Sequence, residues 1–299
     1  MGTFFRRLPK VDYCAPENLQ EVLSLISGKQ KKEFLLYAGG TDLIPKIKKR
    51  LIEPPEMLID LKGIPDLNYI NYDPGKGLKI GALTTVRSVA TSPIVKKHFP
   101  IFSQAAASIA STQIQNRATV VGNICNAVPS ADSAPALLAL QASLLCVSLK
   151  GERIIPLEKF FIGPGQTILK EDEMVREIQI PEMVSRSRGI YFKLSPRKRM
   201  DLALVGVAVI MGMKEGICED LRIGLGAVAP TPLRAKKAEA ILCKEKLTLG
   251  HIERTAEAAA DESRPIDDHR ASAYYRKAMV RILVKRGIQT ISQMSQSFS

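Results

Sequence analysis

A short glycine-bearing segment, Ala38-Gly39-Gly40-Thr41-Asp42-Leu43, has the residue types needed to hold a phosphate group. The apolar run before it predicts a buried strand, and the residues after it predict a helix with Thr41 or Asp42 as its N-cap. Glycines let the backbone approach an anion closely, and the N–H groups and dipole of a helix N-terminus favour negative charge. The spacing is neither that of a Rossmann turn nor that of a P-loop, so an ordinary strand-to-helix turn fits these six residues equally well.

A second segment, residues 116–132 (NRATVVGNICNAVPSAD), is rich in small polar side chains. Its hydroxyls, amides and one carboxylate could hold a polar ligand between Gly122 and a helix predicted to start near Ser133, and residues 123–132 are expected to form a loop. The chain has no HExxH-like pair of histidines and no GxSxG nucleophile elbow. Chemistry at these two segments would therefore be carried by a bound cofactor.

The elements around both segments predict three units in chain order. Alternating strands and helices occupy residues 1–55 and 56–173, and an Ala- and Ser-rich helix is expected over residues 102–114. Residues 174–290 hold successive strands without long helices between them, followed by helical periodicity, which indicates an antiparallel sheet covered by helices. The predicted fold class is therefore α+β, with two α+β subdomains and a C-terminal sheet-plus-helices domain.

Composition indicates a globular protein and leaves its partners open. Of 299 residues, 45% are hydrophobic and 24% are charged, and no apolar run reaches the length of a membrane span. No stretch of signal-peptide length is found, so a cytoplasmic protein is expected. The net charge of +13, with basic clusters at 46–50 and 197–199, fits an anionic ligand, an acidic subunit or nucleic acid, although a solvated surface explains the clusters as simply. The five scattered cysteines form no CxxC pair, so no metal site is expected.

Several separated motifs resemble the FAD-binding medium subunit of the molybdenum hydroxylases, the xanthine dehydrogenase and aerobic carbon monoxide dehydrogenase family. They occur in the same order as in that family and extend from residue 4 to about residue 286. The motifs are AGGTDL at 38–43, QNRAT at 115–119, GNICNAVPSAD at 122–132, FIGPG at 161–165, the string from Tyr191 through Lys193 to Ala203, and DHRASAYYR at 268–276.

The resemblance implies FAD held non-covalently in a PCMH-type fold, in which two α+β subdomains clasp the dinucleotide and the C-terminal sheet closes over the flavin. Residues 38–43 would bind the pyrophosphate, and the second segment would line the opposite side. Val175 would contact the adenine side, and Lys193 would lie near the isoalloxazine or the ribityl chain, where a cation stabilises the negative charge of reduced flavin. The cofactor-binding residues implied in this way are Ala38, Gly39, Gly40, Thr41, Asp42, Leu43, Thr119, Gly122, Asn123, Asn126, Asp132, Val175 and Lys193.

By the same resemblance, the chain would be one subunit of an oxidoreductase and would carry no catalytic residue of its own. A large molybdopterin-binding subunit would oxidise the substrate, and a small subunit with [2Fe-2S] clusters would relay the electrons. The FAD would then pass them to NAD, a quinone or another acceptor. The expected assembly is a dimer of heterotrimers in which basic residues of this chain contact more acidic subunits. Neither nucleic acid nor a membrane span is expected.

One departure from the family pattern keeps two alternatives open. The family has two glycines before Asn123, whereas this sequence has Val121 and Gly122. A β-branched residue at positive φ would be strained and would weaken FAD binding, whereas at negative φ nothing would be lost. A weakened site would favour a flavin-free basic binding protein for nucleic acid or an acidic protein. A self-sufficient oxidase with covalent FAD is the other alternative, for which Cys125 is the available attachment residue.

Overall fold

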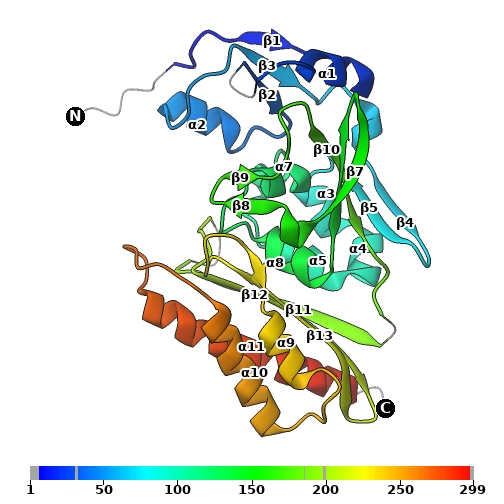
Figure 1. Cartoon of the computed structure of the whole chain (residues 1–299), viewed down its shortest axis with the longest axis vertical. Helices are drawn as coiled ribbons and strands as arrows, with labels where there is room; N and C mark the ends of the chain where they lie inside the picture. Colours follow the sequence, from blue (N-terminus) through cyan, green and yellow to red (C-terminus); the bar gives the residue numbers. More distant parts are fainter. Residues whose placement is uncertain (1–6, 31–32, 185, 198–199, 297–299) are drawn as a thin grey trace.

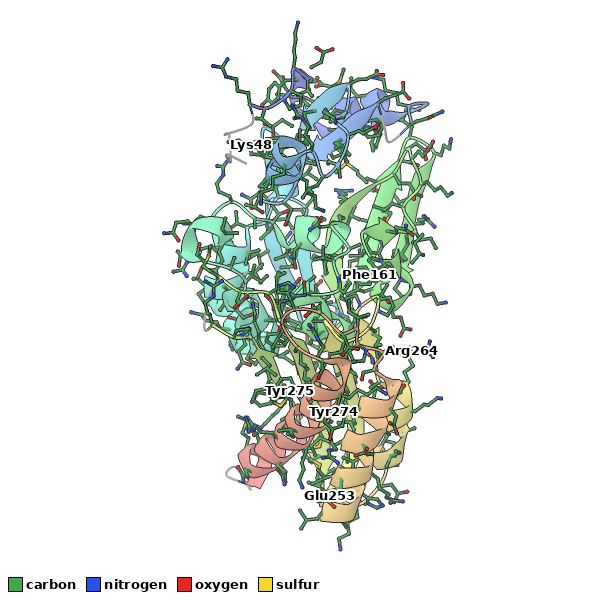
Figure 2. All side chains as sticks on the ribbon, turned by 90° about the vertical axis from the view of Figure 1, so that its left-hand side faces the viewer. Lys48, Phe161, Glu253, Arg264, Tyr274 and Tyr275 are labelled. Carbon is green, nitrogen blue, oxygen red and sulfur yellow. The ribbon has the colours of Figure 1, made fainter. Side chains whose placement is uncertain are left out.

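The structure is a computed structural model that describes residues 7–30, 33–184, 186–197 and 200–296. Three larger sheets follow one another along the long axis of the molecule, with helices around them (Figure 1). In the view turned by 90°, Lys48 of the first unit and Glu253 of the last lie toward opposite ends (Figure 2). The predicted α+β class is confirmed. Within the described ranges, no helix has both the length and the apolar character needed to cross a bilayer.

The first unit is a small parallel sheet with strand order β1-β3-β2. Its first helix begins after Asn18, whose side-chain oxygen accepts a hydrogen bond from the N–H of Glu21. One face of that helix is apolar, and it buries Val22 and Ile26 completely. The elements are β1 (Asp12–Cys14), α1 (Leu19–Ile26), β2 (Phe34–Tyr37), α2 (Leu43–Lys49) and β3 (Met57–Asp60).

The second unit contains a five-stranded antiparallel sheet with the order β4-β5-β10-β6-β7. Phe99, Phe102 and Ile178 are fully buried in a hydrophobic cluster that continues into the first unit. The elements are η1 (Pro65–Leu67), β4 (Ile70–Asp73), β5 (Gly77–Gly81), α3 (Val86–Thr91), α4 (Pro93–His98), α5 (Pro100–Ala107), α6 (Thr112–Gln115), α7 (Val120–Cys125), α8 (Ser133–Ala139), β6 (Ser143–Ser148), β7 (Gly151–Pro156), η2 (Leu157–Lys159), β8 (Phe161–Gly163), β9 (Gln166–Thr167) and β10 (Met174–Ile180).

The third unit is a four-stranded antiparallel sheet buried on both faces, with the order β11-β12-β13-β14. One face packs on α5 and α8, and the other is covered by α9 and α11. In the long apolar strand β12, Ala208 and Ile210 therefore belong to the cluster of the second unit, whereas Val207 and Val209 belong to a separate C-terminal cluster. The elements are β11 (Ser187–Leu194), β12 (Val205–Lys214), β13 (Ile217–Gly226), β14 (Leu233–Arg234), α9 (Lys236–Leu242), α10 (Leu249–Glu262) and α11 (Ala273–Gln296).

Two strands pair outside the units in which the predicted boundaries put them. β3 begins just after the boundary at 55/56 but pairs with β1 and β2. β10 begins at the boundary at 173/174 but forms the centre of the second sheet, between β5 and β6. Strand pairing is a non-local property that no local pattern reports. The observed pairing favours boundaries after β3 and β10, near residues 61 and 183. The division into domains remains a proposal.

Two local predictions near the second segment are wrong. The helix expected over 102–114 is divided into α5 and α6, and Ala110 between them has a φ of 44°, which an α-helix does not tolerate. The loop expected over 123–132 is helical up to Cys125, where α7 ends. This short helix forms because Thr119 caps its N-terminus, accepting a hydrogen bond from the N–H of Gly122.

Candidate functional site

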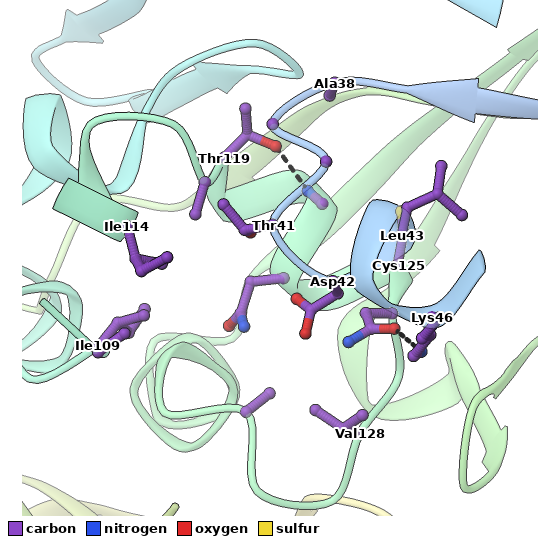
Figure 3. Close-up of a pocket in the computed structure, with 18 of the residues that line it drawn as sticks. Ala38, Thr41, Asp42, Leu43, Lys46, Ile109, Ile114, Thr119, Cys125 and Val128 are labelled. Carbon is purple, nitrogen blue, oxygen red and sulfur yellow. Dashed lines mark hydrogen bonds between the residues drawn. The ribbon is translucent and has the colours of Figure 1, made fainter. Parts of the chain in front are cut away.

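A cavity of about 600 Å³ lies between the first two units (Figure 3) and reaches the segment between β11 and β12 of the third. Its volume falls in the range of ligand pockets, about 300–1,000 Å³. All six residues of the segment 38–43 line it, and they face side chains from the segment 116–132. The fold therefore brings together the two segments that the sequence singled out. The predicted residues that line the cavity are Ala38, Gly39, Gly40, Thr41, Asp42, Leu43, Thr119, Gly122, Asn123, Asn126 and Asp132.

The first wall of the cavity depends on two glycines after β2. A Cβ added at Gly39 would lie 2.2 Å from the carbonyl oxygen of Arg117, so only glycine allows the two segments to touch. Gly40 has a φ of 69°, in the left-handed region that favours glycine. Asp42 then precedes α2 as its N-cap but makes no capping hydrogen bond, and its carboxylate lies in the cavity (Figure 3).

The second wall is α7 and the residue before it. The Thr119 hydroxyl oxygen accepts a hydrogen bond of 3.0 Å from the N–H of Gly122. A Cβ added at Gly122 would lie 2.7 Å from that same oxygen, so the glycine leaves room for the cap. Asn123, one residue further, accepts a 2.6 Å hydrogen bond from the Ser133 hydroxyl through its side-chain oxygen. The polar side chains on this wall are thus fixed by their own local contacts.

Val121 introduces no strain into this wall. It lies inside α7 and is not among the described residues with positive φ. Its side chain is only 5% exposed and belongs to the hydrophobic cluster of the second unit, and it does not line the cavity. The backbone therefore does not strain Val121. Val121 gives no reason to expect weakened FAD binding, and so no reason to expect a flavin-free protein.

The loop that follows α7 is held in place by segments from two other parts of the chain. Ala127 has a φ of 48°, and its carbonyl accepts a 2.8 Å hydrogen bond from the N–H of Gly165 in the FIGPG turn. The carbonyl of Pro129 accepts a 2.7 Å hydrogen bond from the N–H of Ala227, after β13. These two contacts fix the path of the loop, and with it the positions of Asn126 and Asp132 at the cavity.

Asp132 lies at the junction of the cavity and the third unit, where it forms a buried ion pair. Its Oδ2 is 2.7 Å from Nζ of Lys193, and the Lys193 ammonium also donates to the carbonyl of Ser108 at 3.2 Å. The hydroxyl of Tyr191 donates to Oδ1 of Asp132 at 3.1 Å. Burial raises the pKa of Asp132, and these two donors partly offset the rise. Burial and the neighbouring carboxylate also raise the pKa of Tyr191.

Two predicted residues do not line the cavity. Lys193 reaches it only through its ion pair with Asp132. Val175 is 4% exposed in β10 and packs in the hydrophobic cluster of the second unit. The contacts of these two residues with a cofactor remain predictions.

The cavity also has lining residues that the sequence did not single out. Lys46 is one of them, and its position one helical turn after Asp42 on α2 is the signal that could have found it. An apolar part of the lining comes from two further regions. One is the break between α5 and α6, which no motif marks, and the other is the segment before β12, which lies inside the motif from Tyr191 to Ala203 but was not assigned to the site. Lys198 and Arg199 of the second basic cluster lie outside the described residues. The apolar lining residues from these two regions are Ile109, Ala110, Ile114, Met200 and Leu202.

The size and the lining of the cavity suit a dinucleotide. Two segments containing close-packed glycines and polar side chains face each other across a cavity of suitable size, and their backbones approach too closely for a Cβ at Gly39. These features fit FAD, whose phosphates need close backbone approach and whose rings need apolar walls.

Comparisons with known proteins then give the family. Residues 9–183 match the family described as FAD binding domain in molybdopterin dehydrogenase, and residues 190–291 match the CO dehydrogenase flavoprotein C-terminal domain. The chain therefore belongs to the FAD-binding medium subunits of the molybdenum hydroxylase family, as the motifs indicated, and it is an oxidoreductase subunit.

Individual relatives resemble the chain over almost its full length. It is 34% identical to the carbon monoxide dehydrogenase medium chain of Hydrogenophaga pseudoflava, over 94% of this chain and 96% of that one. It is 31% identical to a putative xanthine dehydrogenase FAD-binding subunit of Escherichia coli, over 92% and 94%. Among solved structures, carbon monoxide dehydrogenase from Hydrogenophaga pseudoflava superimposes with a TM-score of 0.90 at 35% identity, covering 95% of this chain and 97% of that chain. The predicted PCMH-type architecture is thereby confirmed.

Proposed function

We propose that this chain holds one FAD in the cavity between residues 38–43 and 119–132 and transfers electrons through it, as the medium subunit of a molybdopterin-dependent hydroxylase or dehydrogenase. One observation carries the proposal: the segments 38–43 and 116–132 meet at one cavity, in a chain of the FAD-binding family. FAD, when bound, supplies the redox chemistry, because no protein side chain exchanges electrons as readily. The chain's own residues bind the cofactor, orient it and shield it from water.

Different parts of the lining would perform these tasks. The backbone around Gly39 and Gly40 would approach the diphosphate, since no Cβ stands in the way. The apolar residues at the break between α5 and α6 would exclude water from the rings. The Asp132–Lys193 ion pair would balance the charge of the Asp132 carboxylate at the cavity wall, so that this carboxylate repels negative charge on the cofactor less than an unpaired one would. Rigidity of this wall is favoured by the burial of both side chains.

The electrons would arrive from a small [2Fe-2S] subunit and leave for NAD, a quinone or another acceptor, and a large molybdopterin-binding subunit would oxidise the substrate. The assembly we propose is a dimer of heterotrimers located in the cytoplasm. Two observations support partners of this kind: the similar proteins carry names of medium chains and subunits, and the net charge of +13 suits contacts with acidic surfaces.

The proposal is tested by purifying the chain with its neighbouring subunits and recording the visible absorption spectrum before and after denaturation. We expect the native complex to show flavin absorption. After denaturation, FAD should be found in the supernatant, and no flavin should stay bound to the protein. Substrate added without oxygen should then bleach the flavin, and the native acceptor should restore it. Folded protein that neither contains FAD nor binds it on titration would contradict the proposal.

A further inference from the structure

Lys46 joins the two subdomains at the cavity wall. It lies on α2, one turn after Asp42, and its ammonium donates a 2.5 Å hydrogen bond to the side-chain oxygen of Asn126, in the loop after α7 (Figure 3). The lysine is partly buried and lines the cavity together with Asn126. The sequence assigned it only to a basic cluster that a solvated helix face would explain, whereas the fold turns it inward.

The charges around the cavity make this lysine unusual. Among the described lining residues it is the single lysine or arginine, and three carboxylates accompany it. Asp132 is paired with Lys193 at 2.7 Å, and Asp201 with Arg197 at 3.3 Å. The third carboxylate, Asp42, lies in the cavity beside the lysine's own helix and makes no capping hydrogen bond. A ligand with two negative phosphates would meet repulsion here unless a cation of the lining offset it.

We propose that Lys46 is the cation that binds the diphosphate of FAD and makes this cavity select a dinucleotide over an uncharged flavin. The inference rests on the proposed function and extends it to one residue. Asn126 is a neutral acceptor, so it holds the ammonium at the cavity wall without neutralising it. When a phosphate oxygen replaces the amide oxygen as acceptor, both partners of the hydrogen bond are charged, and the bond is stronger than the one to the neutral amide.

The test compares Lys46→Met with Lys46→Arg and with Lys49→Met, which removes an exposed lysine from the same helix. Each ligand-free protein is titrated with FAD, with riboflavin, which has no phosphate, and with ADP as a competitor of FAD, while flavin fluorescence is followed. We expect Lys46→Met to weaken FAD and ADP binding roughly ten- to a hundred-fold. Riboflavin binding should change less than twofold, and the salt dependence of FAD binding should become shallower.

Lys46→Arg should recover most of the affinity for FAD, because it keeps the positive charge, and Lys49→Met should behave as the unmodified chain. Unmodified FAD affinity in Lys46→Met would overturn the inference, and so would an equal loss for riboflavin and FAD, which would indicate a structural role. The absence of FAD binding by the unmodified, folded chain would overturn the proposed function itself. Circular dichroism and the urea midpoint of each variant establish that it is folded.

Discussion

Replacement of Lys193 by methionine should leave the Asp132 carboxylate buried without its cation. The two side chains are 10% and 9% exposed, so water can replace little of the lost interaction. Methionine is close in length and removes both hydrogen bonds of the ammonium, to Asp132 and to the carbonyl of Ser108. Breaking a buried ion pair on one side costs about 3–5 kcal/mol. We expect about 3 kcal/mol, at the lower end of that range, because the Tyr191 hydroxyl still donates to Asp132.

The pH dependence of the effect is a sharper test than its size. Burial already raises the pKa of Asp132, and without Lys193 it should rise further. In Lys193→Met the folded chain then binds a proton more readily than the unfolded chain does. The contribution of Asp132 to the stability of this variant is therefore greatest below the unfolded pKa of an aspartate and falls as the pH rises through the higher folded value. The free energy of unfolding that Lys193→Met loses relative to the unmodified chain should therefore be smaller at pH 5 than at pH 7.

Urea unfolding of the ligand-free chain at several pH values measures both effects. Circular dichroism is the suitable signal, because the chain has no tryptophan. The double variant Asp132→Asn/Lys193→Met removes both charges and should cost less than Lys193→Met alone. Lys285→Met removes one side of an exposed pair with Glu253 and should hardly move the midpoint. A deficit that is the same at pH 5 and pH 7, or a double variant less stable than the single one, would refute the reasoning.

Three further predictions concern other parts of the chain. Gly39→Ala should weaken FAD binding at least roughly tenfold, since its Cβ would displace the Arg117 backbone, whereas Gly250→Ala, with open space around it, should bind normally in the same titration. Arg276→Met should lower the free energy of unfolding by about 3 kcal/mol in urea, because the buried guanidinium bonds two carbonyls and Asp268; a value near zero would exclude that role. Cys125→Ser should retain full flavin content, and acid precipitation should release all flavin from the unmodified chain; flavin left on the protein would instead support covalent attachment through this cavity-lining thiol.

Much of the architecture follows from local patterns that the sequence displays. The apolar run before Gly39 predicts the strand there, and successive strands without long helices between them predict the antiparallel sheet of the third unit. The two glycine segments, which supply most of the cavity lining, are also recognisable by residue type. The family motifs give their order along the chain. These features depend on neighbouring residues, and a single sequence therefore contains them.

The tertiary structure alone decided how those pieces meet. β3 and β10 take partners from distant segments, and no local propensity distinguishes one partner from another. Val121 causes no backbone strain, because α7 places its side chain in the hydrophobic core. The residue pair Val121-Gly122 could not indicate this by itself. Lys46 lines the cavity because folding places it beside Asn126, which is distant in the chain. Asp132 and Lys193 form a buried ion pair for the same reason. The sequence specifies the chemical type of each residue, whereas burial and contact partners are determined only when the chain packs.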